Sequence, residues 1–273
     1  SNDGTFLKYF NKGFQLFACD PTIKKFKKFY RKDIKTTADF FSADKFDNLK
    51  FDLITSIAMF YDLPDPLKFA RDIRGLLAND GVWHVEMSYM PSMLNSRSYD
   101  TICHEHLEYY SIRSIKFLTD LSNLKIINIS FNQINGGSIS LDIAKNNSNF
   151  KEDKTLLNWL LFREKLLKFN NLKTQKIFFN NIKKQKLLLF NLIKKLRSRG
   201  KKICGYGAST KGNVILQYCG LTEKHLDYIF EVNPFKFNRY TPGSRIEILP
   251  ERYIKKVKPD YLLVLPWHFK EHI

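Results

Sequence analysis

Short apolar runs alternate with helical stretches along the first half of the chain. Apolar runs that end at Asp, Pro, Gly or a polar cluster predict strands at 14–19, 35–41, 51–59 and 82–87. Apolar residues at helical spacing predict helices at 22–32, 65–77 and 112–121. We expect the strand at 51–59 to be buried, and Asn79-Asp80-Gly81 to turn the chain into the next strand. Strands that alternate with helices indicate an α/β fold with a parallel sheet and a ligand crevice at the carboxyl ends of the strands.

Two further alternating runs, 125–131 and 138–144, are joined by Asn135-Gly136-Gly137 and predict a hairpin that closes the sheet. The polar segment 145–149 then predicts the end of a first domain, 1–146.

Residues 153–199 follow a helical pattern with one break near Asn170-Asn171. We expect these helices, within 147–200, to bridge two domains, because apolar residues around much of their circumference favour packing against protein over a membrane surface or nucleic acid. A second strand-to-helix pattern begins at 202–204, and strands at 226–231 and 261–265 follow it. These elements predict a second, smaller domain at 201–273.

The composition adds limits to this picture. The chain has 273 residues, 44% of them hydrophobic and 15% aromatic, which is enough for packed cores. Long apolar runs and a signal-peptide pattern are missing from the sequence, so we expect a soluble, cytoplasmic protein with no membrane partner. The four cysteines are widely spaced and predict free thiols. The sequence indicates no oligomeric state.

The formal net charge of +18 has two interpretations. It could attract nucleic acid or another anionic partner. The excess is lysine spread along the whole chain beside Asn, Ile and Phe, a pattern typical of an AT-rich genome. We therefore favour composition as its origin, then a nucleotide-bearing substrate, and expect no nucleic acid partner.

The segment 98–111 concentrates imidazoles, carboxylates and phenols and is interpreted as a catalytic loop. His106 is the candidate general base, with His104 as its rival, and Glu105 could orient the ring of His106. If the segment is extended, His104 and His106 share a face and Glu105 points away from it. A metal site is disfavoured because no third ligand lies nearby in sequence. The structural alternative is the polar end of a strand that leads into a helix.

Other polar residues also fall at predicted strand ends. Tyr61 and Asp62 follow the strand at 51–59, so we expect them to lie beside the 104–106 segment. Asp20 ends the first strand, where an acid commonly binds a ribose, and the loop Asn2-Asp3-Gly4 before it turns into a helix. No strand precedes this glycine loop, so the chain is expected to begin in mid-motif.

The second domain carries its own candidate anion site. Backbone N–H groups at Gly205, Gly207 and Ser209 open a helix and could approach a pyrophosphate, and Lys211 would add a positive charge. A third glycine at the dinucleotide spacing is missing. The aromatic and basic loop 233–243 is interpreted as a functional surface loop, with a lid over a core as the alternative.

Together these segments resemble the S-adenosylmethionine-dependent sugar C-methyltransferases, which methylate carbon 3 of nucleotide-linked 4-keto-deoxysugars. The matching segments are 1–4, 20–21, 59–62, 88–94, 99–111, 135–138, 205–213, 233–243 and 265–269. The resemblance implies a class I Rossmann-like methyltransferase domain and a smaller Rossmann-like domain that binds the nucleotide sugar. Because the family also carries an amino-terminal zinc module and further strands, this chain is expected to be a fragment cut at both ends.

The resemblance also implies roles for individual residues. Base-catalysed enolate formation and methyl transfer would use the catalytic residues His106, Glu105, His104, Tyr61 and Asp62. S-adenosylmethionine would contact Asn2, Asp3, Gly4, Asp20, Asp39, Phe40 and Ser56. The nucleotide sugar would contact Cys103, Tyr109, Gly205, Gly207, Ser209, Lys211, Asn233, Arg239 and Tyr240. Cys103 stands where the sugar enzymes carry Tyr, and Tyr61-Asp62 where they carry His, which leaves the sugar and the methylated carbon open.

Two alternatives compete with this enzyme. A nucleic-acid methyltransferase would explain the charge, but the predicted crevice segments 56–64 and 86–92 carry almost no Lys or Arg. A non-catalytic nucleotide-sugar-binding fragment would keep only the second domain functional.

Overall fold

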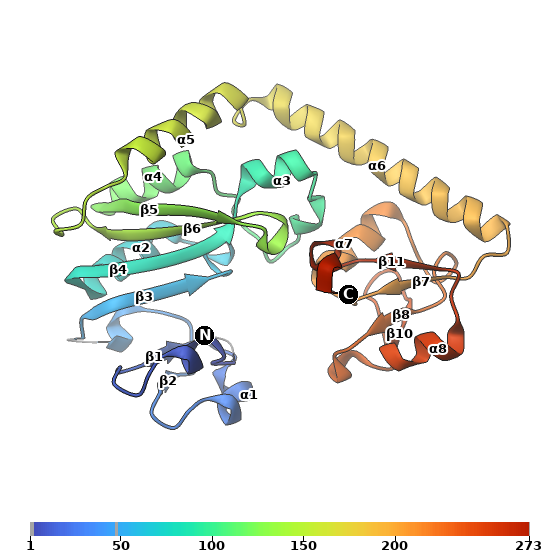
Figure 1. Ribbon diagram of the computed structural model, residues 1–273, viewed down its shortest axis with the longest axis horizontal. Helices are drawn as coiled ribbons and strands as arrows, with labels where there is room; N and C mark the ends of the chain where they lie inside the picture. The colour runs from blue at the N-terminus through green and yellow to red at the C-terminus, as the bar shows by residue number, and fades with distance from the viewer. Residues whose placement is uncertain (1–2, 47–48, 273) are drawn as a thin grey trace.

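The computed structural model describes residues 3–46 and 49–272, and its strands form three sheets (Figure 1). A parallel pair near the amino terminus contains β1 (Phe17–Cys19) and β2 (Lys35–Thr37). A four-stranded sheet follows it in the chain, and a five-stranded sheet lies in the last third. The α/β class predicted from the sequence is confirmed.

The four-stranded sheet has the order β3-β4-β6-β5. β3 (Phe51–Ile57) runs parallel to β4 (Leu77–Ser88), whereas β6 (Ser138–Lys145) is antiparallel to both β4 and β5 (Leu124–Asn132). The predicted hairpin through Asn135-Gly136-Gly137 is therefore present, and this sheet is mixed rather than wholly parallel.

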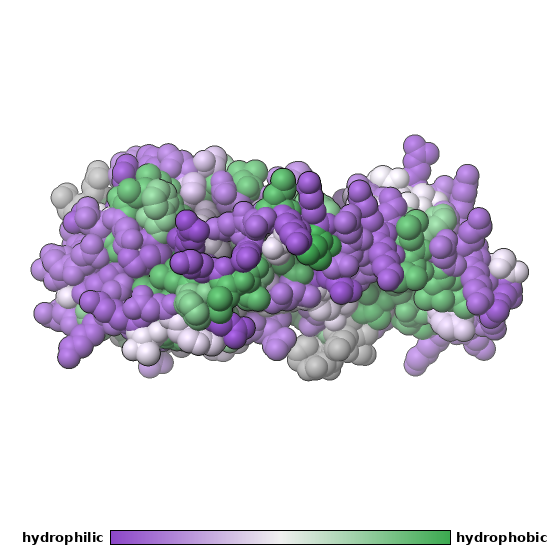
Figure 2. Space-filling model, turned by 90° about the horizontal axis from the view of Figure 1, so that it is seen from above, coloured by the Kyte–Doolittle hydropathy of each residue, from purple (hydrophilic) through white to green (hydrophobic). Residues whose placement is uncertain are grey.

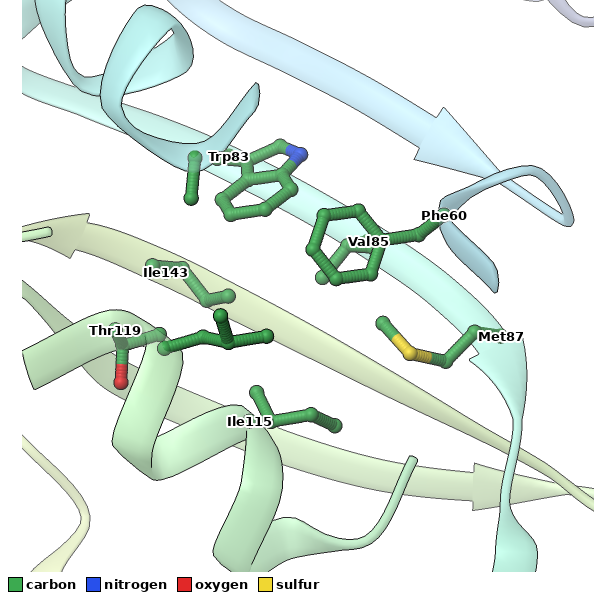
Figure 3. Close-up of a pocket in the computed structure, with 9 residues that line it drawn as sticks. Phe60, Trp83, Val85, Met87, Ile115, Thr119 and Ile143 are labelled. Atoms are coloured by element: carbon green, nitrogen blue, oxygen red, sulfur yellow. The ribbon is translucent and has the colours of Figure 1, made fainter. Parts of the chain in front are cut away.

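Buried and half-buried residues alternate along β4 from Gly81 to Ser88. Trp83, Val85 and Met87 are buried on one face, while His84 and Glu86 are half-buried on the other. The buried face packs against α2 (Pro66–Leu76) and α4 (Ile112–Leu121) (Figure 3). A void of about 10 Å³ remains between them, and its lining is apolar apart from Thr119, so it is a packing defect of the core and not a ligand site.

Two expectations about this region are wrong. β3 was expected to be buried, yet it lies at an edge of the described sheet, and its Leu53 and Ile57 are 45% and 41% exposed. The predicted turn Asn79-Asp80-Gly81 lies inside β4, where the pairing with β3 shifts register after Phe51. A Cβ at Gly81 would lie 2.5 Å from the carbonyl oxygen of Phe51, so only glycine allows this close approach.

The helix expected at 22–32 is shorter than predicted, because α1 (Ile23–Phe26) gives way to a 3-10 turn at Lys27–Phe29. Farther along, α3 (Met90–Ser96) follows β4 and ends at Arg97 in the left-handed conformation.

Two helices connect the sheets. α5 (Lys154–Leu167) packs beside α4, and α6 (Leu172–Ser198) runs from there to the five-stranded sheet (Figure 1). The predicted break between them is therefore present at 168–171. Seen from the side of these helices, the surface mixes hydrophobic patches with hydrophilic residues, as Figure 2 shows. None of the described helices is both long and apolar enough to cross a membrane.

The five-stranded sheet has the order β11-β7-β8-β10-β9 and is parallel except for β9. Its strands are β7 (Ile203–Tyr206), β8 (Ile229–Glu231), β9 (Arg239–Tyr240), β10 (Glu247–Pro250) and β11 (Tyr261–Val264). The helices are α7 (Thr210–Cys219) and α8 (Ile254–Val257). The core of this sheet also includes Met93 and Tyr99 from the first half of the chain, so the two halves share buried surface.

Candidate active site

The His-Glu-His segment lies beside the turn at 60–62 that follows β3. It is not extended: the N–H of His106 donates to the carbonyl of Cys103 at 3.2 Å and closes a turn. The next two N–H groups, of Leu107 and Glu108, donate to the carbonyl of Tyr61 at 2.9 and 3.1 Å. The expectation that His104 and His106 share one face of an extended chain is therefore wrong, since His104 is exposed and His106 is half-buried.

The ring of His106 has a fixed orientation. Its Nδ1 lies 2.7 Å from the carbonyl oxygen of Thr101, and the ring centroid is 4.4 Å from that of Tyr61. Because a carbonyl only accepts, Nδ1 must carry the proton, and Nε2 keeps its lone pair in the neutral ring. Thr101 therefore has the orienting role that the sequence suggested for Glu105, whose side chain is exposed.

Tyr61 and Asp62 lie next to this ring, in the 3-10 turn η4 (Phe60–Asp62). Burial, followed by the charges of Asp62, Cys103 and Glu86, raises the pKa of Tyr61 to about 12. Tyr61 therefore remains a neutral phenol at physiological pH and can donate a hydrogen bond. The pKa of Asp62 is also raised, mainly by desolvation, with the charge of His106 opposing the shift.

Cys103 and Tyr109 flank the same turn. Both side chains are half-buried, and burial together with the nearby thiol of Cys103 raises the pKa of Tyr109. The structure therefore brings together Tyr61, Asp62, Cys103, His106 and Tyr109, while His104 and Glu105 point to solvent.

A second group of hydrogen-bonded side chains lies on the polar face of the four-stranded sheet. Ser140 Oγ is 3.2 Å from His84 Nε2, and His84 Nδ1 is 2.7 Å from Asp142 Oδ1. Serine hydrolases use the same series of Ser, His and Asp side chains, but they also need free N–H groups that stabilise an oxyanion. Ser140 lies in the middle of β6 with strands paired on both sides, so we interpret this group as structural.

The amino-terminal glycine loop closes against the ring of Tyr30. Gly4 is buried with φ +73°, and a Cβ there would lie 2.9 Å from the ring of Tyr30. Asp3 accepts from Thr5, whereas Asn2 lies outside the described residues. Burial and the charges of Asp20 and Asp3 raise the pKa of Tyr30 to about 12, so these groups lie around one small space.

Asp20 ends β1 and is held in place by Thr22, whose N–H and hydroxyl donate to Oδ1 at 2.8 and 2.5 Å. Burial acts in the opposite direction, but these hydrogen bonds lower the pKa of Asp20 and keep it ionised. A fixed carboxylate beside a glycine cradle fits the ribose and methionine ends of S-adenosylmethionine.

The other predicted cofactor residues lie differently. Ser56 is buried, and its hydroxyl accepts from Trp83 Nε1 at 3.1 Å, so it supports the core instead of facing a crevice. Asp39 forms an ion pair with Lys45 at 2.6 Å, and the ring of Phe40 is 75% exposed. A partly solvated aromatic ring remains compatible with an adenine contact.

A larger cleft, of about 470 Å³, lies at the carboxyl ends of β7 and β8. Gly207 and Ser209, two of the predicted nucleotide-sugar residues, line it, and Ser209 caps α7 by accepting from the N–H of Gly212. Glu231 and Lys236 line it as well. Lys236 Nζ donates to the carbonyl of Ala208 at 2.8 Å and lies 3.5 Å from Glu231 Oε2.

The remaining predicted substrate residues do not line this cleft. Gly205 packs in the sheet, where a Cβ would overlap Ile229, and Asn233 caps a 3-10 turn by accepting from the N–H of Phe235. Arg239 and Tyr240 form β9 at the far edge of the sheet and are exposed. Their roles in binding the nucleotide are therefore not supported by their positions.

Lys211 lies between the two halves of the chain. Its Nζ donates to the carbonyl and side-chain oxygens of Asn135 at 3.2 and 3.3 Å. Desolvation lowers its pKa, against the opposing charges of Asp100 and Cys103. Lys236, not Lys211, is therefore the lysine that lines the cleft. Glu231 lies at the carboxyl end of β8, where acidic residues commonly mark a ligand site, so this sequence signal would have predicted the region.

Two family models match the chain. A methyltransferase domain matches residues 1–129, and a C-methyltransferase C-terminal domain matches residues 133–273. The chain is also similar to the C-methyltransferase NovU of Streptomyces niveus, with 29% identity over 214 residues, 78% of this chain. The match spans only 51% of that relative, so the chain covers about half of its length.

Solved structures give weaker likenesses. LepI in complex with SAM has a TM-score of 0.44 and 11% identity, covering 53% of this chain and 41% of LepI. The 1,6-didemethyltoxoflavin-N1-methyltransferase of Burkholderia thailandensis has a TM-score of 0.40 and 12% identity, covering 52% and 67%. Both scores are low, so neither likeness supports a statement about activity. The carboxyl-terminal family match alone spans more than half of the sequence, and the chain therefore belongs to the C-methyltransferase family.

Proposed function

We propose that this chain is the catalytic part of an S-adenosylmethionine-dependent C-methyltransferase that acts on a nucleotide-linked 4-keto-deoxysugar. The observation that carries the proposal is the fixed tautomer of His106, whose Nδ1 is bound by the Thr101 carbonyl while Nε2 keeps its lone pair beside Tyr61. A methyl group can be added to a carbon next to a ketone only after a base removes a proton from that carbon. General-base catalysis of this kind typically contributes about 10²–10⁴-fold in rate.

The neighbouring side chains have complementary roles in this proposal. Nε2 of His106 accepts the proton from the substrate carbon, and the electron pair of the broken C–H bond moves towards the keto oxygen. Tyr61, a neutral phenol with a raised pKa, donates a hydrogen bond to the negative charge that develops there. Cys103 and Tyr109 would then shape the space around the sugar ring.

Two binding regions support this chemistry. Gly4, Asp20 and Tyr30 would hold S-adenosylmethionine, which supplies an electrophilic methyl group when bound. The cleft beside Gly207, Ser209 and Lys236 would hold the nucleotide diphosphate, since a helix N-terminus and a lysine both attract anions. A cytoplasmic location is part of this proposal.

Solvent deuterium exchange tests the base directly. The chain is incubated in heavy water without a methyl donor. The substrates are nucleoside-diphosphate-linked 4-keto-deoxysugars that differ in the nucleobase. We expect deuterium to enter the carbon next to the ketone, and His106→Asn to slow this by about 10²–10⁴-fold. His104→Asn is the matched control, because His104 lies two residues away and is exposed.

Exchange lost only in the His104 variant would transfer the role to His104. Exchange retained in both variants would remove this loop from proton abstraction.

A further inference from the structure

The segment that fixes His106 is itself held by the second half of the chain. It is the 3-10 turn η5 (Tyr99–Thr101), whose three residues are buried and packed against α7. Tyr99 OH lies 3.4 Å from Cys219 Sγ at the end of that helix. The hydroxyl of Thr101 donates to the carbonyl of Ser98 at 2.8 Å, so the turn is closed within itself.

Asp100 is the charged residue of this turn, and it is 3% exposed. Its Oδ2 accepts from Trp267 Nε1 at 3.1 Å, across 167 residues of sequence. Lys211 and His268 lie within electrostatic reach of it, because its charge acts to raise the pKa of both side chains against the desolvation that lowers them. A carboxylate this deeply buried needs such partners, because an unpaired buried charge is strongly unfavourable.

Trp267 lies in the chain between two residues that line the cleft of the five-stranded sheet. It directly follows Pro266 and precedes Phe269 by two residues, and both of those residues line the 470 Å³ cleft. On its other side its ring approaches Gly136, where a Cβ would lie 3.2 Å from the indole. The indole therefore packs against the hairpin of the first half, while its neighbours in the chain line the cleft.

We infer that Asp100 is a positioning residue that connects the cleft at the carboxyl ends of β7 and β8 to the general base. The connection runs from the cleft wall through Trp267 Nε1 to Asp100, and along one peptide unit to the Thr101 carbonyl that binds His106 Nδ1. A ligand in the cleft that shifts Trp267 changes how firmly His106 is held. The inference rests on the proposed role of His106 as a base, but the connection itself is a property of the folded chain.

Imidazole nitrogen NMR of histidine-labelled protein tests the connection without any turnover. The His106 signals are assigned with His106→Asn. In the wild type we expect Nδ1 to carry the proton, and UDP, used as the probe for the cleft, to shift the His106 signals. In Trp267→Phe, which keeps a ring but removes the donor, the preference for the Nδ1 proton should weaken and the response to UDP should be lost.

Two substitutions at Asp100 separate positioning from folding. Asp100→Asn keeps an oxygen that accepts from Trp267 and should retain the wild-type tautomer, whereas Asp100→Ala should lose it. Trp159→Phe, on an exposed face of α5, is the control and should change nothing. If Asp100→Ala does not fold, Trp267→Phe carries the test alone.

An unchanged His106 tautomer and UDP response in Trp267→Phe would overturn the inference. In the exchange assay we expect Trp267→Phe to lower the rate by about 10²-fold, the scale for a misplacement of a catalytic group, with UDP affinity unchanged. If His106→Asn exchanges normally while the NMR connection is present, the proposed function fails and the connection stands.

Discussion

At the scale of single residues, a histidine is a useful base only when one nitrogen is free and correctly directed. The Thr101 carbonyl achieves this for His106 through one 2.7 Å contact. No sequence pattern predicts this contact, because every residue has a backbone carbonyl. Only the turn at 103–106 brings the Thr101 carbonyl to the ring of His106. The imidazole itself was predictable, since the segment 98–111 is unusually rich in titratable groups.

Tyr61 provides a prediction at this scale. Tyr61→Phe removes the phenol but keeps the ring against His106, so turnover should fall by about 10²–10³-fold, as for the loss of one oxyanion donor. Steady-state kinetics should show the loss in kcat with little change in KM. Tyr110→Phe is the matched control, because the Tyr110 hydroxyl is buried and has no hydrogen-bond partner among the described residues. Equal losses in the two variants would argue against a role for Tyr61 in charge stabilisation.

Lys236 provides a second prediction. Lys236→Met should weaken binding of UDP by about 1.5–3 kcal/mol, the range for hydrogen bonds to charged groups, because its ammonium lies in the cleft. Lys211→Met should leave UDP affinity nearly unchanged, since Lys211 contacts Asn135 outside that cleft. Calorimetric titration measures both, and the reverse order would restore the diphosphate role first predicted for Lys211.

At the scale of elements, the sequence predicted correctly those helices and turns that depend mainly on nearby residues. The helix at 112–121 was predicted with the bounds of α4, and the glycine pair marked the β5–β6 hairpin. The strand β3 was misjudged because burial depends on neighbours in the sheet, which a single apolar run cannot reveal. Asn79-Asp80-Gly81 has the composition of a turn. The residues before and after it nevertheless pair with β3, and this pairing keeps the segment within β4.

Glu231, at the end of β8, allows a test of pH dependence. Burial acts to raise its pKa, but N–H groups of Asn233, Val232 and Ala208 and the charge of Lys236 outweigh burial and lower it. A lowered pKa in the folded state means that the carboxylate stabilises the fold above its unfolded pKa. That contribution is lost as the pH falls below about 5 and through the folded pKa.

Glu231→Gln should therefore lower the free energy of unfolding by about 1.5–3 kcal/mol at neutral pH. The difference from the wild type should shrink as the pH falls, in denaturant titrations repeated at several pH values. Glu251→Gln is the control, because that exposed carboxylate accepts from Tyr206 alone among the described residues. A difference that is constant with pH would contradict the ionised role of Glu231.

At the scale of the whole molecule, the two halves are joined by more than the bridging helices. The core of the five-stranded sheet continues into Met93 and Tyr99, and Lys211 and Trp267 reach from the second half to Asn135 and Asp100. Sequence patterns predicted the helices α5 and α6 but not these contacts, which join residues far apart in the chain. The domain limits 1–146, 147–200 and 201–273 stay a prediction.

The most direct measurement follows a labelled methyl group. The chain is incubated with S-adenosylmethionine that carries an isotope-labelled methyl carbon and with the panel of nucleotide-linked 4-keto-deoxysugars, and the product is analysed by carbon NMR. We predict a new carbon–carbon bond next to the ketone in the wild type, with none in His106→Asn. A label found on oxygen or nitrogen, or equal transfer by the His106 variant, would contradict C-methylation through this base.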